Sequence, residues 1–409
     1  MFPKLRFKEF DGDLTESKLV ELTSWASGGT PAKDVPEYWG DDIPLISGAS
    51  MHTNQLYESD VKITKLGLQK GSKLAPKDSI LILVRGSMLF NKIPMGITLG
   101  DVAFNQDVKC IRPKQQLAPL FLFQWLHAKE NTIQNKVTAT GIGAGKLDTA
   151  DLQNLKLYKP SLEEQTKIAT FLSAVDEKIS QLTQKHALLS QYKQGMMQKL
   201  FSQQIRFKAD DGGEFAKWED SKLGELTTLI TKGTTPSSLG EKYEESGINF
   251  IKIESLSSNG KFLLDKFAYI DENTHNKLAR SKLEHDDILF SIAGALGRVA
   301  IISRDYLPAN TNQALAIIRL KDKKITRYIY YFLNSDYVKK IIDAESVQLA
   351  QANFSLGQLA NLDVLVPCLE EQTKIANFLS AIDQKIEVVA QQIEQAKTWK
   401  KGLLQQMFI

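Results

Sequence analysis

The stretch Leu162 to Ile179 reads LEEQTKIATFLSAVDEKI, and the stretch Leu369 to Ile386 reads LEEQTKIANFLSAIDQKI. The two stretches are identical at 15 of 18 positions and are offset by 207 residues. Agreement of this length does not arise by chance, so the chain contains an internal repeat of a whole structural unit.

The repeat extends well beyond these two stretches. The same offset pairs Pro160 with Pro367, Gly195 with Gly402 and Phe201 with Phe408. Fainter matches upstream pair Arg6-Phe7-Lys8 with Arg206-Phe207-Lys208, Gly29-Thr30-Pro31 with Thr234-Thr235-Pro236, and Asn105-Gln106 with Asn312-Gln313. The sequence therefore predicts two half-proteins in tandem, each a diverged globular region followed by a well-matched segment of about 40 residues.

Each matched segment carries apolar residues at alternating spacings of three and four, which is the seam of a coiled-coil helix. Pro160 and Pro367 mark the entry points, and the Glu-Glu pair after each suits a helix N-terminus. A helix of about 40 residues is about 60 Å long, and one seam cannot be buried alone. We therefore expect the two helices to pack antiparallel about a pseudo-twofold axis, with one globular region at each end. His186 and Lys193 fall in the seam, where such residues mostly fix the register, and no chemistry is assigned to them.

The globular regions mix two kinds of pattern. Strand-like runs include 80–84 and 314–320, and helix-like runs include 119–129 and 325–340. The predicted fold class is α+β, with two mixed α/β domains in tandem separated by two long antiparallel coiled-coil helices. The predicted boundaries are 1–158 for the first domain, 159–205 for the central helix, 206–366 for the second domain and 367–409 for the C-terminal helix.

Composition limits the function only broadly. The 409 residues have a formal net charge of +3, far below that of proteins that bind nucleic acid by charge alone. The two cysteines, Cys110 and Cys368, stand apart and form no metal-binding or disulfide pattern. The longest aliphatic run is too short to cross a bilayer, and the N-terminus lacks the apolar stretch of a signal peptide. We expect a cytoplasmic protein with no membrane partner.

Catalytic motifs are missing from the sequence. The segment Gly141 to Lys146 resembles a phosphate-binding loop, but Thr140 and Leu147 replace the glycine and the Ser or Thr that such a loop needs. An Asn-Pro-Pro-Tyr type methyltransferase tetrad does not occur, and the five histidines show no ligand spacing. We expect the chain not to be an enzyme and to hold no cofactor or metal.

Each matched segment opens with Pro-x-Leu-Glu-Glu-Gln-x-x-Ile-Ala, as PSLEEQTKIA at 160–169 and PCLEEQTKIA at 367–376. Two diverged α/β regions alternating with two such helices resemble the specificity subunits of type I restriction-modification systems. The resemblance covers nearly the whole chain, and its duplication makes it more specific than a single short motif.

The resemblance implies that each globular region is a target recognition domain reading one half of a split DNA sequence, with the helices setting the gap. Because the two regions have diverged, the half-sites should differ and the bipartite target should be asymmetric. The implied partners are double-stranded DNA, two methyltransferase subunits and motor-nuclease restriction subunits. S-adenosylmethionine, ATP and magnesium would then act on those partner subunits.

Polar residues of the predicted loops are the candidates for DNA contact. Arg suits guanine and Asn or Gln suits adenine, whereas Lys, Ser and Thr more often hold phosphate. The candidates are Lys33, Ser47, Ser50, Arg85, Ser87, Thr138, Thr140 and Lys146 in the first domain, and Lys232, Thr234, Ser237, Lys252, Ser255, Arg298, Gln348, Gln351 and Asn353 in the second. The Asn-Gln pairs at 105 and 312 recur in both domains, which favours a structural role.

Two other hypotheses remain open on the sequence. A structural adaptor, whose globular regions bind proteins, predicts no salt-dependent binding to duplex DNA. A single-chain DNA-modifying enzyme with an unfamiliar active site predicts methyl transfer or cleavage by the purified chain. The outer helix faces, rich in Gln, Lys, Glu and Ser, fit either plain solvated surface or a docking face for methyltransferase subunits.

Overall fold

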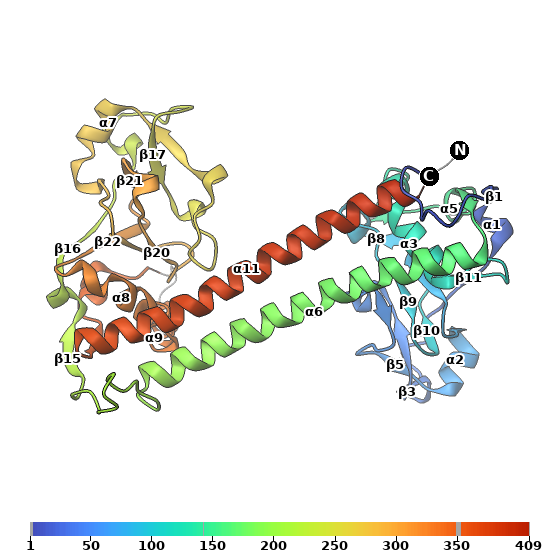
Figure 1. Ribbon diagram of the computed structural model, residues 1–409, viewed down its shortest axis with the longest axis horizontal. Helices are drawn as coiled ribbons and strands as arrows, with labels where there is room; N and C mark the ends of the chain where they lie inside the picture. Colours follow the sequence, from blue (N-terminus) through green and yellow to red (C-terminus); the bar gives the residue numbers. More distant parts are fainter. Residues whose placement is uncertain (1–2, 142, 349–352, 409) are drawn as a thin grey trace. The chain divides into compact units, whose positions relative to one another are not determined.

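The computed structural model describes residues 3–141, 143–348 and 353–408 (Figure 1). The chain divides into two compact units. Unit 1 comprises Met1–Gln184 together with Ala390–Ile409, and unit 2 comprises Lys185–Val389. Each long helix is thus shared between the units, a different division from the four segments expected from the sequence.

The two matched segments form the long helices α6 (Leu162–Phe201) and α11 (Leu369–Met407). In unit 1, Leu172 near the start of α6 shares a hydrophobic core with Leu403 near the end of α11. In unit 2, Leu200 at the end of α6 shares a core with Leu379 near the start of α11. The helices therefore run antiparallel, and the predicted fold class is confirmed.

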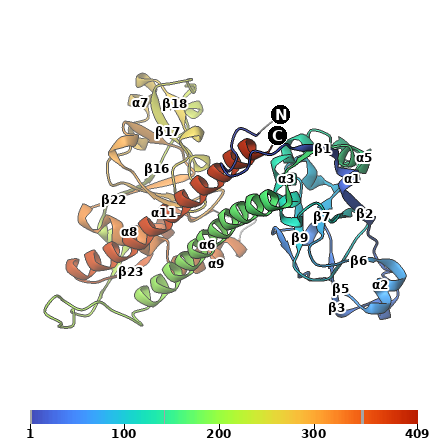
Figure 2. The same cartoon turned by 45° about the vertical axis from the view of Figure 1, so that its right-hand side comes forward.

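Unit 1 contains a mostly antiparallel sheet, in which only β4 and β9 pair in parallel, with a second sheet beside it (Figure 2). The first sheet has five strands in the order β2 (Thr23–Ser27), β11 (Val108–Pro113), β7 (Ile80–Leu83), β9 (Met95–Thr98) and β4 (Gln55–Leu56). The second sheet has four strands in the order β5 (Lys62–Ile63), β3 (Trp39–Ile46), β10 (Val102–Phe104) and β6 (Lys73–Ala75). The unit also contains β1 (Thr15–Lys18) paired with β14 (Lys156–Lys159), and the helices α1 (Leu19–Leu22), α2 (Lys65–Gly71), α3 (Pro119–Ala128), α4 (Glu130–Gln134) and α5 (Thr149–Gln153). Apolar residues of β7 and α3 fill one core together with residues of both long helices.

Unit 2 repeats this plan with different residues. Its four-stranded sheet has the order β16 (Thr227–Lys232), β22 (Leu315–Leu320), β19 (Ile288–Ser291) and β20 (Val299–Ile301), and its three-stranded sheet has the order β18 (Ala268–Ile270), β17 (Ile248–Ile251) and β21 (Ala309–Thr311). The remaining elements are β15 (Glu219–Lys222) paired with β23 (Asp363–Val366), and the helices α7 (Glu272–Lys277), α8 (Thr326–Leu333), α9 (Asp336–Gln348) and α10 (Leu356–Ala360). In both units one parallel pair, β3 with β10 or β17 with β21, lies in the second sheet. The two regions therefore share a topology although their sequences have diverged.

An ion pair with a buried glutamate holds the segment before the first strand of each unit against the start of a long helix. In unit 1, Arg6 donates to both carboxylate oxygens of Glu164, at 2.7 and 2.8 Å. In unit 2, Arg206 makes the same contact with Glu371, at 3.1 and 2.7 Å. These glutamates are the second acids of the two Glu-Glu pairs, so one member of each pair is a buried structural residue rather than a solvated helix-end charge.

A polar cluster interrupts the apolar seam of each unit at equivalent positions. Lys400 lies 2.6 Å from Asp176, which also accepts a hydrogen bond from Gln124. In unit 2, Lys193 lies 2.6 Å from Asp383, which accepts a hydrogen bond from the Tyr331 hydroxyl. Burial, and then the charge of Asp383, raise the pKa of Tyr331, so its hydroxyl stays protonated and donates. Lys193, expected in the seam, is thus paired across it.

Removing the acid of one cluster should leave a nearly buried ammonium without a partner. The Lys400 side chain is only 12% exposed, so we expect Asp176→Ala to lower the free energy of unfolding by about 1–3 kcal/mol, measured by urea denaturation. Glu177→Ala, at the exposed neighbouring position, is the matched control and should cost less than about 0.5 kcal/mol. Equal losses in the two variants would show that the cluster does not stabilise the seam.

Candidate nucleic-acid interface

Three of the predicted residues of unit 1 lie side by side on one small sheet. The strands β12 (Thr138–Ala139), β13 (Gly145–Lys146) and β8 (Arg85–Gly86) pair antiparallel. Thr138 lies opposite Lys146, and Lys146 lies opposite Arg85. Directly opposed residues project from the same face of a sheet, and all three are exposed. We call Arg85, Thr138 and Lys146 the hairpin patch.

The electrostatics of the hairpin patch suit a polyanion. Among the described residues, neither Arg85 nor Lys146 has an ion-pair partner, so two positive charges stand one strand apart with no acid to neutralise them. Ser87, two residues after Arg85, is also exposed. Thr140 instead donates to the carbonyl oxygen of Ala144 at 2.9 Å and closes the tip of the hairpin. The patch can therefore hold phosphate or the acceptor edge of guanine, while Thr140 shapes the turn.

Unit 2 has a β-bridge at the position of the hairpin patch, but it carries different side chains there. Ala293 and Asn353 make an isolated β-bridge that corresponds to the pairing of Arg85 with Lys146 in unit 1. Asn353 lies 207 residues after Lys146, and strand pairing places Ala293 at the position of Arg85. Asn353 is exposed. Of the other candidates here, Gln348 is the last residue of α9 and Gln351 lies outside the described residues. An amide therefore replaces an ammonium at this position of the second unit.

A second group of candidates lines a groove of about 570 Å³ in unit 1. Lys33 and Ser47 both lie on it, together with Thr30 and Gln106. Ser50 stands next to this groove, and its hydroxyl accepts a hydrogen bond from the backbone of Ser47 at 2.9 Å. Ser50 thus caps a turn, whereas Lys33 is exposed and has no ion-pair partner in the part of unit 1 that the structure describes.

The equivalent turn of unit 2 corrects one prediction. The Ser255 hydroxyl accepts from the backbone of Lys252 at 3.1 Å and donates to the carbonyl oxygen of Lys266 at 2.9 Å. Ser255 is 0% exposed, so it has no surface with which to touch DNA, and we withdraw it from the candidates. Lys252 is half-buried, and its ammonium lies 5.5 Å from the centre of the Tyr243 ring.

The other candidates of unit 2 differ in their exposure and in the hydrogen bonds that they already make within the protein. Lys232 and Ser237 are exposed. Arg298 is half-buried, and its guanidinium donates to the carbonyl oxygens of Ile253 and Leu256, so it braces a turn. Thr234 accepts a hydrogen bond from Arg280 at 2.9 Å. Arg280 is an exposed cation that the sequence did not single out, because only the folded chain brings it to the Thr234 loop.

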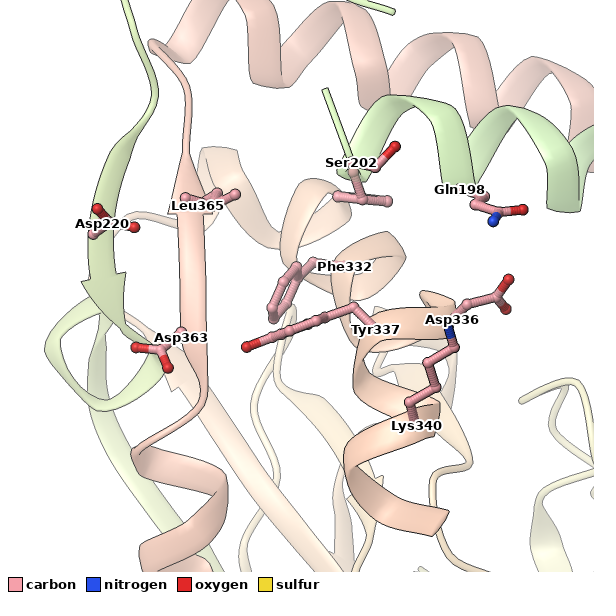
Figure 3. A pocket seen from close by; sticks show the side chains of 10 residues that line it. Gln198, Ser202, Asp220, Phe332, Asp336, Tyr337, Lys340, Asp363 and Leu365 are labelled. Atoms are coloured by element: carbon pink, nitrogen blue, oxygen red, sulfur yellow. The ribbon is translucent and has the colours of Figure 1, made fainter. Parts of the chain in front are cut away.

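Unit 2 also contains a pocket of about 430 Å³ that includes none of the predicted residues (Figure 3). The rings of Phe332 and Tyr337 lie beside each other in its lining, with centres 6.0 Å apart, and Leu365 projects from β23 (Figure 3). The rim carries three aspartates, Asp220, Asp336 and Asp363, against one lysine, Lys340. Asp363 pairs with Lys222 and Asp336 pairs with Lys339, so these charges are largely neutralised. The lining therefore offers no excess of positive charge to hold phosphate, and we do not place nucleic acid here.

The chain matches a known family over both of its halves. The family described as the type I restriction modification DNA specificity domain matches residues 12–191 and again residues 216–398. The chain belongs to this specificity family. The family consists of the non-catalytic recognition subunits of type I systems, which agrees with the missing catalytic motifs of the sequence.

Individual members of the specificity family resemble this chain, some over nearly its whole length and some over about half of it. The type I restriction enzyme MjaVIII specificity subunit of Methanocaldococcus jannaschii is 27% identical over 97% of this chain and 94% of that protein. The EcoR124I/EcoR124II specificity subunit of Escherichia coli is 29% identical over 44% of this chain and 45% of that protein. The crystal structure of the S subunit from M. genitalium covers 100% of this chain and 99% of its own with a TM-score of 0.62 at 17% identity, which supports the fold.

The described residues contain no group of side chains suited to a metal ion and no helix suited to cross a membrane. Within 3–141, 143–348 and 353–408, His, Cys, Asp and Glu side chains form no group of three that could hold a metal ion. Within the same ranges, none of the helices combines the length and apolar character needed to span a bilayer.

Proposed function

We propose that this specificity subunit reads an asymmetric, bipartite DNA sequence, with one globular region for each half-site and the long helices setting the gap between them. The observation that carries the proposal is the tandem family match over two regions that share a topology but differ at their exposed edges. At equivalent positions of those edges, unit 1 has Lys146 and unit 2 has Asn353. Different polar groups at one place in a common fold favour different bases.

The proposed partners follow from membership in the family. The chain would dock two methyltransferase subunits and the motor-nuclease restriction subunits, in the cytoplasm. S-adenosylmethionine, ATP and magnesium would bind to those subunits and none of them to this chain. The exposed outer faces of α6 and α11 offer the length of surface that such docking needs.

The test is to express the chain with the methyltransferase subunit of its own system in a host that lacks adenine methylation. Methylated adenines are then mapped across the genome by single-molecule sequencing. We expect one split, asymmetric motif with a fixed gap. Replacing residues 1–158 with those of another family member should change one half of the motif, and replacing residues 206–366 should change only the other half.

Two outcomes would contradict the proposal. If the complex assembles but methylation is not site-specific, the chain is an adaptor that joins proteins. If the purified chain alone transfers methyl groups or cuts DNA, it is an enzyme in its own right.

A further inference from the structure

One polar pair recurs in both units outside the long helices. In unit 1, the Thr30 hydroxyl donates to Oε1 of Gln106 at 2.7 Å. In unit 2, the Thr235 hydroxyl donates to Oε1 of Gln313. Both glutamines are exposed although they are held in place, so the pair is an ordered polar group at the surface of each unit.

The backbone around each pair is built to bring the two residues together. A Cβ atom on Gly28 would lie 2.1 Å from the carbonyl oxygen of Phe104, and one on Gly233 would lie 2.0 Å from that of Thr311. Only glycine lets the threonine loop press so closely against the strand that precedes the glutamine. The close approach thus places Thr30 beside Gln106 and gives unit 2 the same arrangement.

The asparagine before each glutamine has the structural role that the sequence suggested. Asn105 accepts a hydrogen bond from the backbone of Asp107 at 3.1 Å, and Asn312 accepts one from the backbone of Ala314 at 3.2 Å. These bonds fix the turn that carries the glutamine. The asparagine therefore shapes the loop, and the glutamine side chain is the member that faces outward.

The threonine orients the glutamine amide. Because the threonine hydroxyl donates to Oε1, the Nε2 group is left to donate elsewhere. In unit 1 the neighbouring acceptor for Nε2 is Asp107, at 3.5 Å, which is the outer limit of a hydrogen bond. The pair therefore offers a fixed N–H donor to an acceptor from outside the protein.

A cation lies near each pair. Lys33 lines the same groove as Thr30 and Gln106. In unit 2, the Arg280 guanidinium donates to Thr234, the residue before Thr235. An oriented amide donor together with a flexible positive charge suits an anionic oxygen, such as that of a phosphodiester.

We propose that the Thr30–Gln106 and Thr235–Gln313 pairs each bind a phosphate of the DNA backbone, one pair in each half-site. This inference rests on the proposed function. Two domains that read different bases must differ where they touch bases, but they need the same group wherever they hold the backbone common to all DNA. The Thr-Gln pair is the same in both units, whereas the position of Lys146 carries asparagine in unit 2.

The test measures equilibrium binding of the full chain to two labelled duplexes, one with the mapped motif and one with the motif scrambled, over a range of salt concentrations. We expect Gln106→Ala and Gln313→Ala each to weaken binding to both duplexes by the same factor, about three- to tenfold. The slope of log affinity against log salt should not change, because glutamine is neutral. Lys33→Gln should flatten that slope by about one.

Two further variants separate binding from folding. Gln106→Lys keeps a donor and adds a charge, so it should retain binding to both duplexes and steepen the salt dependence by about one. Gln115→Ala removes an exposed glutamine from another loop of unit 1 and should leave both affinities unchanged. The melting temperature of each variant checks that the chain stays folded.

The outcomes distinguish this inference from the proposed function. If Gln106→Ala weakens only the duplex with the motif, the glutamine reads a base and the inference is overturned. If neither affinity changes, the pair only ties a loop to a strand and the inference is again overturned. If the unaltered chain binds neither duplex in a salt-dependent way, the proposed function itself fails.

Discussion

Glu371→Gln should lower the free energy of unfolding of unit 2 by about 1–3 kcal/mol, because it removes the charge of a buried acid and leaves the half-buried Arg206 without its ionic partner. Glu371 is 0% exposed and accepts hydrogen bonds from Arg206 and from the indole nitrogen of Trp218, the latter at 2.8 Å. Glutamine keeps the shape of the side chain but removes the charge that balances Arg206. Urea denaturation followed by tryptophan fluorescence measures the loss and also reports on Trp218.

The adjacent acid provides a matched control. Glu370 is exposed and lies 3.8 Å from Lys374, so Glu370→Gln should cost less than about 1 kcal/mol. Glu164→Gln should reproduce the large effect in unit 1, where Arg6 loses its partner. A loss below about 1 kcal/mol for Glu371→Gln would mean that the buried pair does not anchor the unit.

Removing both cations of the hairpin patch should have the largest effect on recognition. The double variant Arg85→Ala with Lys146→Ala removes two unpaired charges from one face of the small sheet. A lost contact to a base or a phosphate costs about 1–3 kcal/mol, so we expect the affinity for the motif duplex to fall by at least thirtyfold. Genome mapping with the methyltransferase subunit should then show relaxed sequence preference in one half of the motif.

The control removes two cations from a different part of the chain. Lys178 and Lys185 are exposed on α6, outside the candidate DNA contacts, and their double alanine variant changes the net charge by the same amount. Because α6 is also proposed to dock methyltransferase subunits, this control is measured as DNA binding by the chain alone. It should retain most of the affinity. If both double variants weaken binding equally, net charge rather than the hairpin patch accounts for the effect, and the patch is not part of the interface.

The sequence predicted the long helices well because their information is local and repeated. The spacing of apolar residues from Ile168 onward defines one face of a helix, and the second copy confirms the pattern independently. One apolar seam alone does not show what covers it, but two equal seams in one chain indicate that the two helices pack against each other. The order of the strands, in contrast, depends on contacts between distant segments and could not be read from their short apolar runs.

The sequence identified some residues of the candidate site correctly as exposed polar residues and misjudged others, and individual residues show the physical reasons. Arg85 and Lys146 were each identified as polar loop residues, but only strand pairing places them opposite each other. Ser255 belongs to a turn of the same composition, yet its hydroxyl satisfies buried backbone groups instead of facing water. Composition predicts where a turn forms and does not predict which of its side chains the rest of the fold covers.

The division of the units also bears on how the protein is made. Unit 1 needs Leu403, Met407 and Phe408 to complete its core, and the backbone of Leu5 donates to the carbonyl oxygen of Gln406 at 2.9 Å. At a synthesis rate of about 5–20 residues per second, the ribosome reaches residue 390 on the order of 10–40 s after residue 184. During that interval unit 2, which is continuous in sequence, is still being synthesised, and the apolar surface of unit 1 that these residues cover stays open. The region translated first is therefore the last to be finished.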